Sequence, residues 1–185
     1  MSFDQTDEEI ISIYKNGDRE VFKKLIDKYT QPLFNFIAHL DRENASDILQ
    51  EVFIKVWKNI KKFDEKKSSF KTWIFIIAKN TAFDFLRKRK NILFSDLEKE
   101  EGLENFSESV PDEAILPDEV LSKIEDSEYL NKILNQLPAH YKMILIFHYQ
   151  DEMTFDEIGK ILNKPLNTVK SYHHRAILEL RKMIK

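Results

Sequence analysis

Residues that interrupt helices are scarce in this sequence, which has only three glycines and five prolines among 185 residues. Glycine and proline mark most turns and element ends, so a chain with few of them has few turns. Apolar residues make up 42% of the chain and charged residues 33%, a balance typical of soluble proteins. We therefore expect an all-α fold, in one medium domain or two small ones.

The composition also excludes several kinds of site. Because the chain has no cysteine, it has no disulfide framework, no thiolate zinc site and no cysteine nucleophile. The opening residues MSFDQTDEEI lack the basic start and apolar core of a signal peptide. No apolar run approaches the roughly 20 residues that span a bilayer. We expect a protein that is made and kept in the cytoplasm.

The formal net charge of −3 conceals a division along the chain. Residues 55–90 carry twelve Lys or Arg against three acids, whereas residues 96–128 carry thirteen acids against two lysines. Residues 164–185 return to six basic residues against one acid. Because attraction to phosphate depends on local patches, two basic modules flanking an acidic connection point to nucleic acid as a partner.

Three helices are predicted in the first third of the chain, over residues 7–16, 20–40 and 45–63. In each of them apolar residues recur three and four positions apart. Gly17 and the stretch DREN provide the breaks. Pro32 is expected to kink or split the second helix, because proline lacks the backbone N–H and clashes with the preceding turn.

The third predicted helix has two contrasting faces. Its apolar face carries Leu49, Val52, Phe53, Val56 and Ile60. Its opposite face carries Asp47, Gln50, Glu51 and Ile54. An isoleucine centred on a polar face is either a stray exposed apolar residue, which is common on protein surfaces, or the anchor of a partner-binding surface.

The stretch SSFKTWIFIIAKNTAFDFLRKRK predicts a fourth long helix over residues 70–90, capped by Ser68 or Ser69. The residues expected to face a bundle core are Phe70, Ile74, Ile77, Thr81 and Phe85. The apolar residues expected on its other faces are Trp73, Phe75, Ile76 and Phe83. The helix is therefore either surrounded on most sides or exposes aromatic side chains before its basic end.

An acidic stretch over residues 95–128 shows little periodicity and contains one glycine and two prolines. It is interpreted as a linker that its own charge keeps extended. A short helix near residues 119–134 is expected to belong to the domain that follows.

A helix-turn-helix is predicted near the end of the chain. Pro138 suits the first turn of a helix through Phe147. Thr154 and Glu157 form a capping box that opens a helix over residues 155–162. A turn at residues 163–165 follows, and Asn167 or Thr168 is expected to cap a long final helix. Gly159 is expected where the two helices cross closely, at a helix cost of about 1 kcal/mol relative to alanine.

The final helix is amphipathic. The residues expected to face inward are Val169, Ala176, Leu180 and Ile184. The residues expected nearest to bases or phosphates of a major groove are Asn167, Thr168, Lys170, Ser171, His174 and Arg175. The plainer alternative is a solvated charged helix.

No enzyme site competes with these features. The chain has no Gly-rich phosphate loop and no metal-spaced histidine cluster, and His173 is expected to be a partly buried residue of the apolar face. Asp47 and Glu51 are spaced for an acid and base pair, but Lys55 one turn later favours a ladder of surface ion pairs. We expect no catalysis, no cofactor, no metal and no small-molecule substrate.

Three motifs, in order, resemble the sigma-70 family, specifically its extracytoplasmic-function (ECF) sigma factors. DILQEVFIKVW resembles the family's region 2 helix that binds core polymerase. The 68–90 stretch resembles its −10 recognition segment, and LPAHYKMILIFHYQDEMTFDEIGKILNKPLNTVKSYHHRAILELRKMI resembles region 4. The resemblance implies region 2 over residues 1–94, a linker over 95–127 and region 4 over 128–185. It also implies bacterial core RNA polymerase, through its β′ and β subunits, and promoter DNA as partners.

The resemblance assigns a role to each surface. The residues that would bind the coiled coil of the β′ subunit are Asp47, Gln50, Glu51 and Ile54. The residues that would lie near the −10 strand, where a flipped base is read, are Phe63, Ser68, Ser69, Lys79, Asn80, Arg87, Lys88, Arg89 and Lys90. The final helix would read the −35 element as duplex through the six residues given above.

The chain departs from the family's pattern at Tyr172 and His173, where Arg and Leu are common. The family is often held inactive by an anti-sigma factor, which makes such a partner an expectation here. Two further interpretations fit part of the pattern. A helix-turn-helix regulator that acts without polymerase would have a dispensable first domain, and a helical adaptor would bind partners without supporting transcription.

Overall fold

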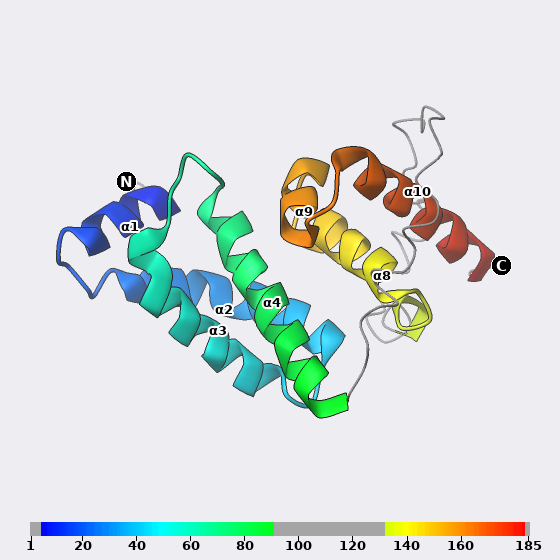
Figure 1. Cartoon of the computed structure of the whole chain (residues 1–185), viewed down its shortest axis with the longest axis horizontal. Helices are drawn as coiled ribbons and strands as arrows, with labels where there is room; N and C mark the ends of the chain where they lie inside the picture. Colours follow the sequence, from blue (N-terminus) through cyan, green and yellow to red (C-terminus); the bar gives the residue numbers. More distant parts are fainter. Residues whose placement is uncertain (1–4, 91–131, 184–185) are drawn as a thin grey trace. The chain divides into compact units, whose positions relative to one another are not determined.

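The computed structural model describes residues 5–90 and 132–183, which fall into two compact units, one in each part of the chain. Figure 1 shows that both units are helical, and no strand occurs within those residues. The expected all-α fold is therefore confirmed. The predicted linker over 95–127, most of the short helix at 119–134, and Ile184 lie outside the described residues. None of the described helices is both long and apolar enough to cross a bilayer.

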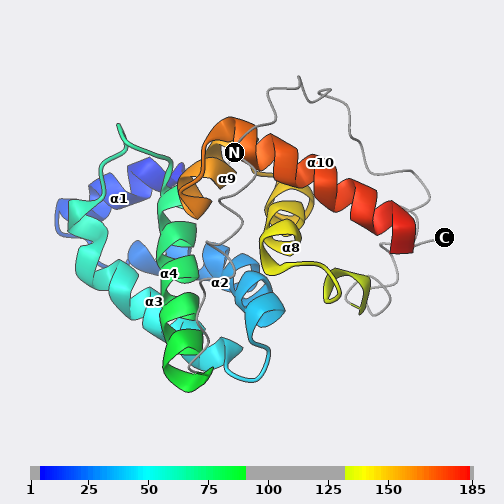
Figure 2. The same ribbon diagram turned by 45° about the vertical axis from the view of Figure 1, so that its right-hand side comes forward.

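The first unit contains four helices and one 3₁₀ turn. They are α1 (Asp7–Lys15), α2 (Phe22–Leu40), α3 (Ala45–Asn59), η1 (Ile60–Lys62) and α4 (Phe70–Lys90). In two views α4 lies across both α2 and α3 (Figure 1 and Figure 2). The helix α2 continues through Pro32 without being split.

The local sequence signals explain where these helices begin. Thr6 accepts a hydrogen bond from the backbone N–H of Glu9, and Glu9 accepts one from the N–H of Thr6, which together form a capping box for α1. Ser69 caps α4, because its Oγ accepts from the N–H of Thr72 at 3.2 Å. The prediction of a serine cap is thus confirmed for Ser69.

The core of the first unit lies where α4 meets α2 and α3. Its fully buried large side chains include Leu33, Phe36, Ile37, Ile48, Phe70, Ile74 and Phe75. Each such side chain contributes roughly 1.5–3 kcal/mol by leaving water. Phe75, which was expected on a different face of α4 from Phe70 and Ile74, is also buried, so α4 is covered on more than one side, as one of the two alternatives allowed. Since α4 has a second helix to pack against, Phe75 meets the ring of Phe36 from α2, with 5.8 Å between centroids.

The second unit contains α8 (Ala139–Leu145), the π-helical turn η3 (Ile146–Gln150), α9 (Phe155–Leu162) and α10 (Leu166–Met183). The helix α10 packs against both α8 and α9. Residues 132–137 also belong to this unit, because Ile133, Leu134 and Leu137 share a buried cluster with Ala176 and Leu180. These residues secure the C-terminal half of α10 and leave its opposite face accessible.

Candidate functional site

One face of α3 presents polar residues together with apolar ones. Asp47, Gln50, Glu51 and Ile54 are all exposed, as the two-faced pattern predicts. Ile54 has 43% of its surface accessible although its neighbours Val52 and Val56 are buried. The opposite face of α3 thus packs into the core, and the face with Ile54 is available to a partner.

Trp57 belongs to the same face and was missed by the sequence reasoning. Its side chain is 53% exposed. Seven residues separate it from Gln50, which brings it back to nearly the same direction on the helix, and three separate it from Ile54. The helical spacing was therefore a signal for Trp57. A solvent-exposed tryptophan close to an exposed isoleucine is unusual on a surface that only contacts water, and it is typical of the centre of a protein interface.

The expected ion-pair ladder from Asp47 through Glu51 to Lys55 does not form as predicted. Lys55 is half-buried and turns toward α4, where its Nζ donates to Thr81 Oγ1 at 3.1 Å. Because Thr81 is buried in α4, the lysine gains a fixed partner there instead of a solvated carboxylate. The acidic face of α3 consequently keeps its charge exposed.

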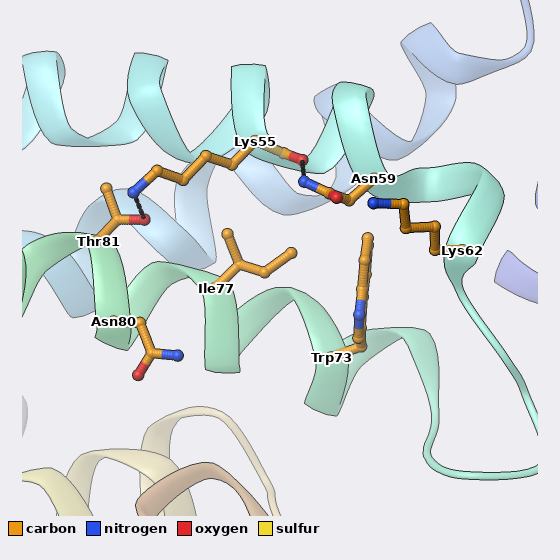
Figure 3. A pocket seen from close by; sticks show the side chains of 7 residues that line it. All are labelled: Lys55, Asn59, Lys62, Trp73, Ile77, Asn80 and Thr81. Atoms are coloured by element: carbon orange, nitrogen blue, oxygen red, sulfur yellow. Dashed lines mark hydrogen bonds between the residues drawn. The ribbon is translucent and has the colours of Figure 1, made fainter.

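A hollow of about 330 Å³ lies between α3, η1 and α4. Its lining residues are Lys55, Asn59, Lys62, Trp73, Ile77, Asn80 and Thr81. Figure 3 shows Trp73 and Ile77 reaching from α4 toward α3 and η1. Asn59 is fixed at the rim, because its Nδ2 donates to the carbonyl of Lys55 at 2.9 Å. The volume is at the lower end of the range for ligand pockets, roughly 300–1,000 Å³.

The lining of this hollow combines three chemical functions. The indole of Trp73 supplies an aromatic surface, the ammonium of Lys62 supplies positive charge, and the amides of Asn59 and Asn80 supply donors and acceptors. An unpaired nucleobase attached to a phosphate backbone requires these same functions. Among the residues predicted from the sequence to lie near a single strand, only Asn80 lines the hollow.

Phe63 is a correction to the sequence-based site. Its side chain is only 5% exposed, and its ring lies edge-on to Phe70 at 5.6 Å and tilted against Trp73 at 5.5 Å. A ring enclosed in this way is not available to stack on a base. Phe63 and Phe70 instead form the support behind Trp73, which reaches the hollow.

The other residues predicted near the −10 strand are distributed along the loop and α4. Ser69 is exposed but occupied as the cap, whereas Ser68 is half-buried. Lys79 is half-buried and does not line the hollow, and burial lowers its pKa. Arg87 and Lys88 are exposed, with Arg87 Nη1 at 3.7 Å from Asp84 Oδ1.

The final two residues of that predicted group, Arg89 and Lys90, complete the last turn of α4. The same helix therefore carries Trp73 and this run of basic positions. Positive side chains at a helix C-terminus are also favoured by the helix dipole.

The predicted helix-turn-helix is present as α9 and α10. The capping box of Thr154 with Glu157 is confirmed, and α9 has the predicted bounds. Asn163 ends the helix in the left-handed region at φ 55°. A Cβ at Gly159 would lie 2.9 Å from the carbonyl oxygen of Lys164 and 3.8 Å from Val169 Cγ2. The glycine is thus required mainly by the turn, rather than by the crossing helix.

The start of α10 differs from the prediction. The helix begins at Leu166, directly after Pro165, and the N–H of Val169 donates to the carbonyl of Pro165 at 3.1 Å. Asn167 and Thr168 therefore lie inside the first turn and are not its caps. Proline is compatible with a helix start because its fixed φ matches the helix and its missing N–H has no intrahelical partner there.

The predicted DNA-reading residues share the accessible side of α10. Asn167 is exposed, and Thr168, Lys170, Ser171, His174 and Arg175 are each half-buried. Val169, Ala176 and Leu180 are buried, as the amphipathic pattern predicts. The first two turns therefore present short polar and basic side chains from a helix whose other side is secured.

Tyr172 and His173 have structural roles within the second unit. Tyr172 packs against Tyr141 and His140 of α8, with ring centroids 5.8 and 4.9 Å apart. His173 is 5% exposed, and its Nε2 is 3.0 Å from the hydroxyl of Tyr149. Burial, followed by the nearby His148 and His174, lowers its pKa to about 4. The expectation of a partly buried histidine is confirmed.

Comparison with known families assigns two segments of the chain. Residues 25–92 match the family described as "Sigma-70 region 2". Residues 127–180 match the family described as "Sigma-70, region 4". The first segment contains the hollow and the two-faced α3, and the second contains the helix-turn-helix.

Individual relatives match nearly the whole chain. It is 34% identical over 175 residues to "ECF RNA polymerase sigma factor SigW" of Bacillus subtilis, which covers 92% of each chain. It is 31% identical over 168 residues to SigX of the same organism, covering 88% of this chain and 83% of that one. It is 27% identical over 179 residues to the ECF sigma-E factor of Escherichia coli, covering 95% and 93%.

Two solved structures share the fold. One is that of CnrH in complex with the cytosolic domain of CnrY, at a TM-score of 0.68 and 16% identity, covering 97% of each chain. The other is the sigma factor RpoE in complex with the anti-sigma factor NepR from Bartonella quintana, at a TM-score of 0.64 and 23% identity, covering 88% of this chain and 96% of that one.

Proposed function

Because this chain belongs to the sigma-70 family and is an ECF-type RNA polymerase sigma factor, we propose that its described surfaces divide the work of promoter recognition. In this proposal residues 1–94 bind core polymerase and the −10 element, residues 128–185 bind the −35 element, and residues 95–127 connect them. The observation that carries the proposal is the hollow beside Trp73, which combines aromatic, amide and ammonium groups.

We assign polymerase binding to the exposed face of α3. Asp47, Gln50 and Glu51 supply carboxylate and amide acceptors, and Ile54 with Trp57 supplies a contiguous apolar centre. A small apolar centre within a polar rim is the usual anatomy of a specific protein interface. The proposed partner is the coiled coil of the β′ subunit, with the β subunit as a further contact of the complex.

We assign capture of the −10 strand to the hollow and the neighbouring loop. A base flipped out of the duplex would stack against Trp73 and exchange hydrogen bonds with Asn80, while Lys62 and the basic end of α4 hold backbone phosphates. Base–aromatic stacking contributes about 1–3 kcal/mol per base. A protein that binds unpaired bases but not paired ones shifts the duplex toward its open state, since a ligand favours the state that it binds. Lys79 and Ser68 remain proposed neighbours of the strand.

We assign −35 recognition to the accessible side of α10. Asn167, Lys170 and Arg175 carry the donors and acceptors that suit base edges and phosphates in a major groove. Thr168, Ser171 and His174 complete that side. The helix-turn-helix geometry supports this assignment, because the second helix of such a pair docks in the groove by its N-terminal half.

The remaining parts of the proposal concern setting and regulation. The protein would act in the cytoplasm with the polymerase and would have no catalysis of its own. One solved structure of a similar fold is a sigma factor bound by an anti-sigma factor, which supports an anti-sigma factor as a further partner here. Such a partner would inhibit transcription by covering the polymerase- or DNA-binding surfaces.

The first test combines capture of core RNA polymerase by the purified protein with in vitro transcription from a randomised promoter library. We expect stable binding and transcripts enriched for two short elements. Binding without transcripts would contradict the assigned DNA surfaces, and no binding would favour a regulator that acts without polymerase.

Charge reversal tests the α3 surface. Glu51→Arg should weaken core polymerase binding about tenfold, corresponding to about 1.4 kcal/mol, without lowering thermal stability. Glu20→Arg is the matched control, because Glu20 is also exposed in the first unit but lies outside α3. Equal affinity of the two variants would remove Glu51 from the interface.

Truncation of one arginine tests α10. Arg175→Ala should weaken binding of the selected −35 duplex about tenfold, within the 1–3 kcal/mol range of a specific contact. Lys132→Ala removes an exposed charge of the same unit from a residue outside α10 and should have little effect. Similar binding by both variants would exclude a contact from Arg175.

A further inference from the structure

The first helix contacts both ends of the loop that leads into the hollow. This loop, residues 64–69, joins η1 to α4 and is bracketed by Phe63 and Phe70. In both views α1 lies at the end of the unit where the loop is found (Figure 1 and Figure 2). The contacts are made by opposite ends of α1, so one short helix spans the base of the loop.

Lys15, in the last turn of α1, holds the residue before the loop. Its Nζ donates to the carbonyl oxygen of Phe63 at 2.9 Å and lies 5.9 Å from the centroid of the Phe63 ring. The two contacts fix the main chain and the ring of the same residue. The hydrogen bond therefore joins the end of α1 to a residue 48 positions later in the chain.

The first turn of α1 holds the residue after the loop. Asp7 is only 9% exposed, accepts the hydroxyl hydrogen bond of Tyr29, and pairs with Lys28 Nζ at 2.6 Å. The ring of Tyr29 then meets Phe70 edge-on at 5.5 Å. Glu8 adds a longer contact, since its Oε1 accepts from the N–H of Phe70 at 3.5 Å.

These two sets of contacts converge on Trp73. Phe63 and Phe70 touch each other, and each also packs against the indole, at 5.5 and 5.6 Å. Trp73 in turn lines the hollow. A continuous series of contacts therefore connects both ends of α1 with the aromatic wall of the hollow.

We propose that α1 is a positioning element for the single-strand site: Lys15 and the Asp7–Tyr29 pair hold Phe63 and Phe70 so that Trp73 is fixed before DNA arrives. This proposal rests on the function assigned above to the hollow. A side chain that is already fixed loses less conformational entropy on binding, so preorganisation strengthens binding without a new contact to the ligand. Lys15 is thus a positioning residue that touches no base.

The test uses the full-length chain assembled with core polymerase. The probe is a fluorescein-labelled single-stranded DNA that carries the −10 sequence of the most active selected promoter, and its binding is followed by anisotropy. Lys15→Met keeps the side-chain stem but removes the donor, and we expect it to bind the probe three- to tenfold more weakly. Lys15→Arg restores a donor and should bind within twofold of the unaltered protein.

Lys24→Met provides the matched control. Lys24 is exposed, and its Nζ donates to Gln5 Oε1 at 2.7 Å rather than to Phe63. The same charge is lost, so we expect no change in probe binding. Affinity for core polymerase and the melting temperature should be equal in all three variants. If Lys15→Met also lowers the polymerase affinity or the melting temperature, and probe binding falls only to the same extent, then Lys15 has a merely structural role. That result would overturn the proposal.

A spectroscopic measurement reports on the indole itself. The chain has two tryptophans, so Trp57→Phe leaves Trp73 as the sole emitter. In that background, and in the free full-length protein, Lys15→Met should raise the acrylamide quenching constant of Trp73 about twofold. An unchanged constant would overturn the positioning role.

Asn80→Ala separates the two levels of the proposal. If Asn80→Ala weakens probe binding but Lys15→Met does not, the hollow binds DNA and the positioning role is wrong. If neither substitution changes probe binding, the proposed function of the hollow fails, and the role of α1 fails with it. Weakening by both, with Lys24→Met unchanged, supports both.

Discussion

A tyrosine hydroxyl joins distant parts of the chain in each unit, but it meets a carboxylate in the first unit and an imidazole in the second. Tyr29 donates to Asp7, 22 positions away, and Tyr149 pairs with His173, 24 positions away. In both places a buried polar group, Asp7 in the first unit and His173 in the second, obtains a hydrogen-bond partner from a distant part of the chain. The pairs therefore specify which helices pack together, beyond what apolar contact alone would specify.

The two pairs differ in their response to pH. Burial, followed by the hydrogen bond and negative charge of Asp7, raises the pKa of Tyr29 above its ordinary value of 10.0. Burial and the neighbouring histidines lower the pKa of His173 from its ordinary value of 6.5 to about 4. Both shifts favour the neutral form of the group, so the first unit is sensitive to alkali at this pair and the second is sensitive to acid.

Acidification should produce the largest difference between the units. The unfolded chain protonates residue 173 as the pH falls through 6.5, whereas the folded chain resists until about pH 4. The free energy of unfolding of the second unit should therefore fall between pH 6.5 and 4 and then level off. The part of this fall in the free energy of unfolding that is due to His173 approaches roughly 3 kcal/mol.

Urea unfolding of the unaltered protein and of His173→Gln at several pH values would measure this share. Far-UV circular dichroism reports both units, whereas tryptophan fluorescence reports only the first, because Trp57 and Trp73 both lie there. We expect the substitution to flatten the pH dependence of the dichroism transition and to leave the fluorescence transition unchanged. An identical pH dependence in both proteins would contradict the buried neutral histidine.

Gly159→Ala should have the next largest effect, again confined to the second unit. In an exposed helix this substitution gains about 1 kcal/mol. Here the new methyl group would lie 2.9 Å from the backbone carbonyl of Lys164, so overpacking reverses the sign and costs about 1–3 kcal/mol. The dichroism transition should move to lower urea concentration while the fluorescence transition stays in place. A stabilised variant would show that the turn adjusts.

Removal of each tyrosine hydroxyl should produce the smallest difference between the two units, and it compares the two pairs directly. Tyr29→Phe removes a donor from a buried carboxylate and should cost about 1.5–3 kcal/mol, offset in part by Lys28, which remains paired with Asp7. Tyr149→Phe removes a hydrogen bond between neutral groups and should cost about 1 kcal/mol. Each change should affect only its own unit, and equal costs would show that the charge of Asp7 is already compensated.

The elements defined by short sequence motifs were predicted well. The bounds of α9 follow from Thr154, Glu157 and Asn163, because capping and left-handed termination involve only neighbouring residues. The exposed face of α3 likewise follows from helical spacing within one element. The start of α10 was misplaced, since several polar residues near Pro165 were equally acceptable caps.

The hollow could be predicted only in part. Helical spacing places Trp73 and Asn80 on related sides of α4, but it does not indicate which sides other helices cover. The sequence left open whether the face of α4 with Phe75 is covered, and α2 buries it. Phe63 was expected near the −10 strand and is buried behind Trp73. Both outcomes concern side chains whose surroundings come from other elements.

The sequence by itself determined the helical class, the division into two basic modules and the helix-turn-helix, because these depend on composition, periodicity and local hydrogen bonds. Only the tertiary structure decided that Lys55 turns to Thr81, that Lys15 reaches Phe63, and that burial lowers the pKa of His173. These outcomes depend on contacts between residues more than twenty positions apart. Such contacts are set by how whole helices pack, and a local pattern does not contain that information.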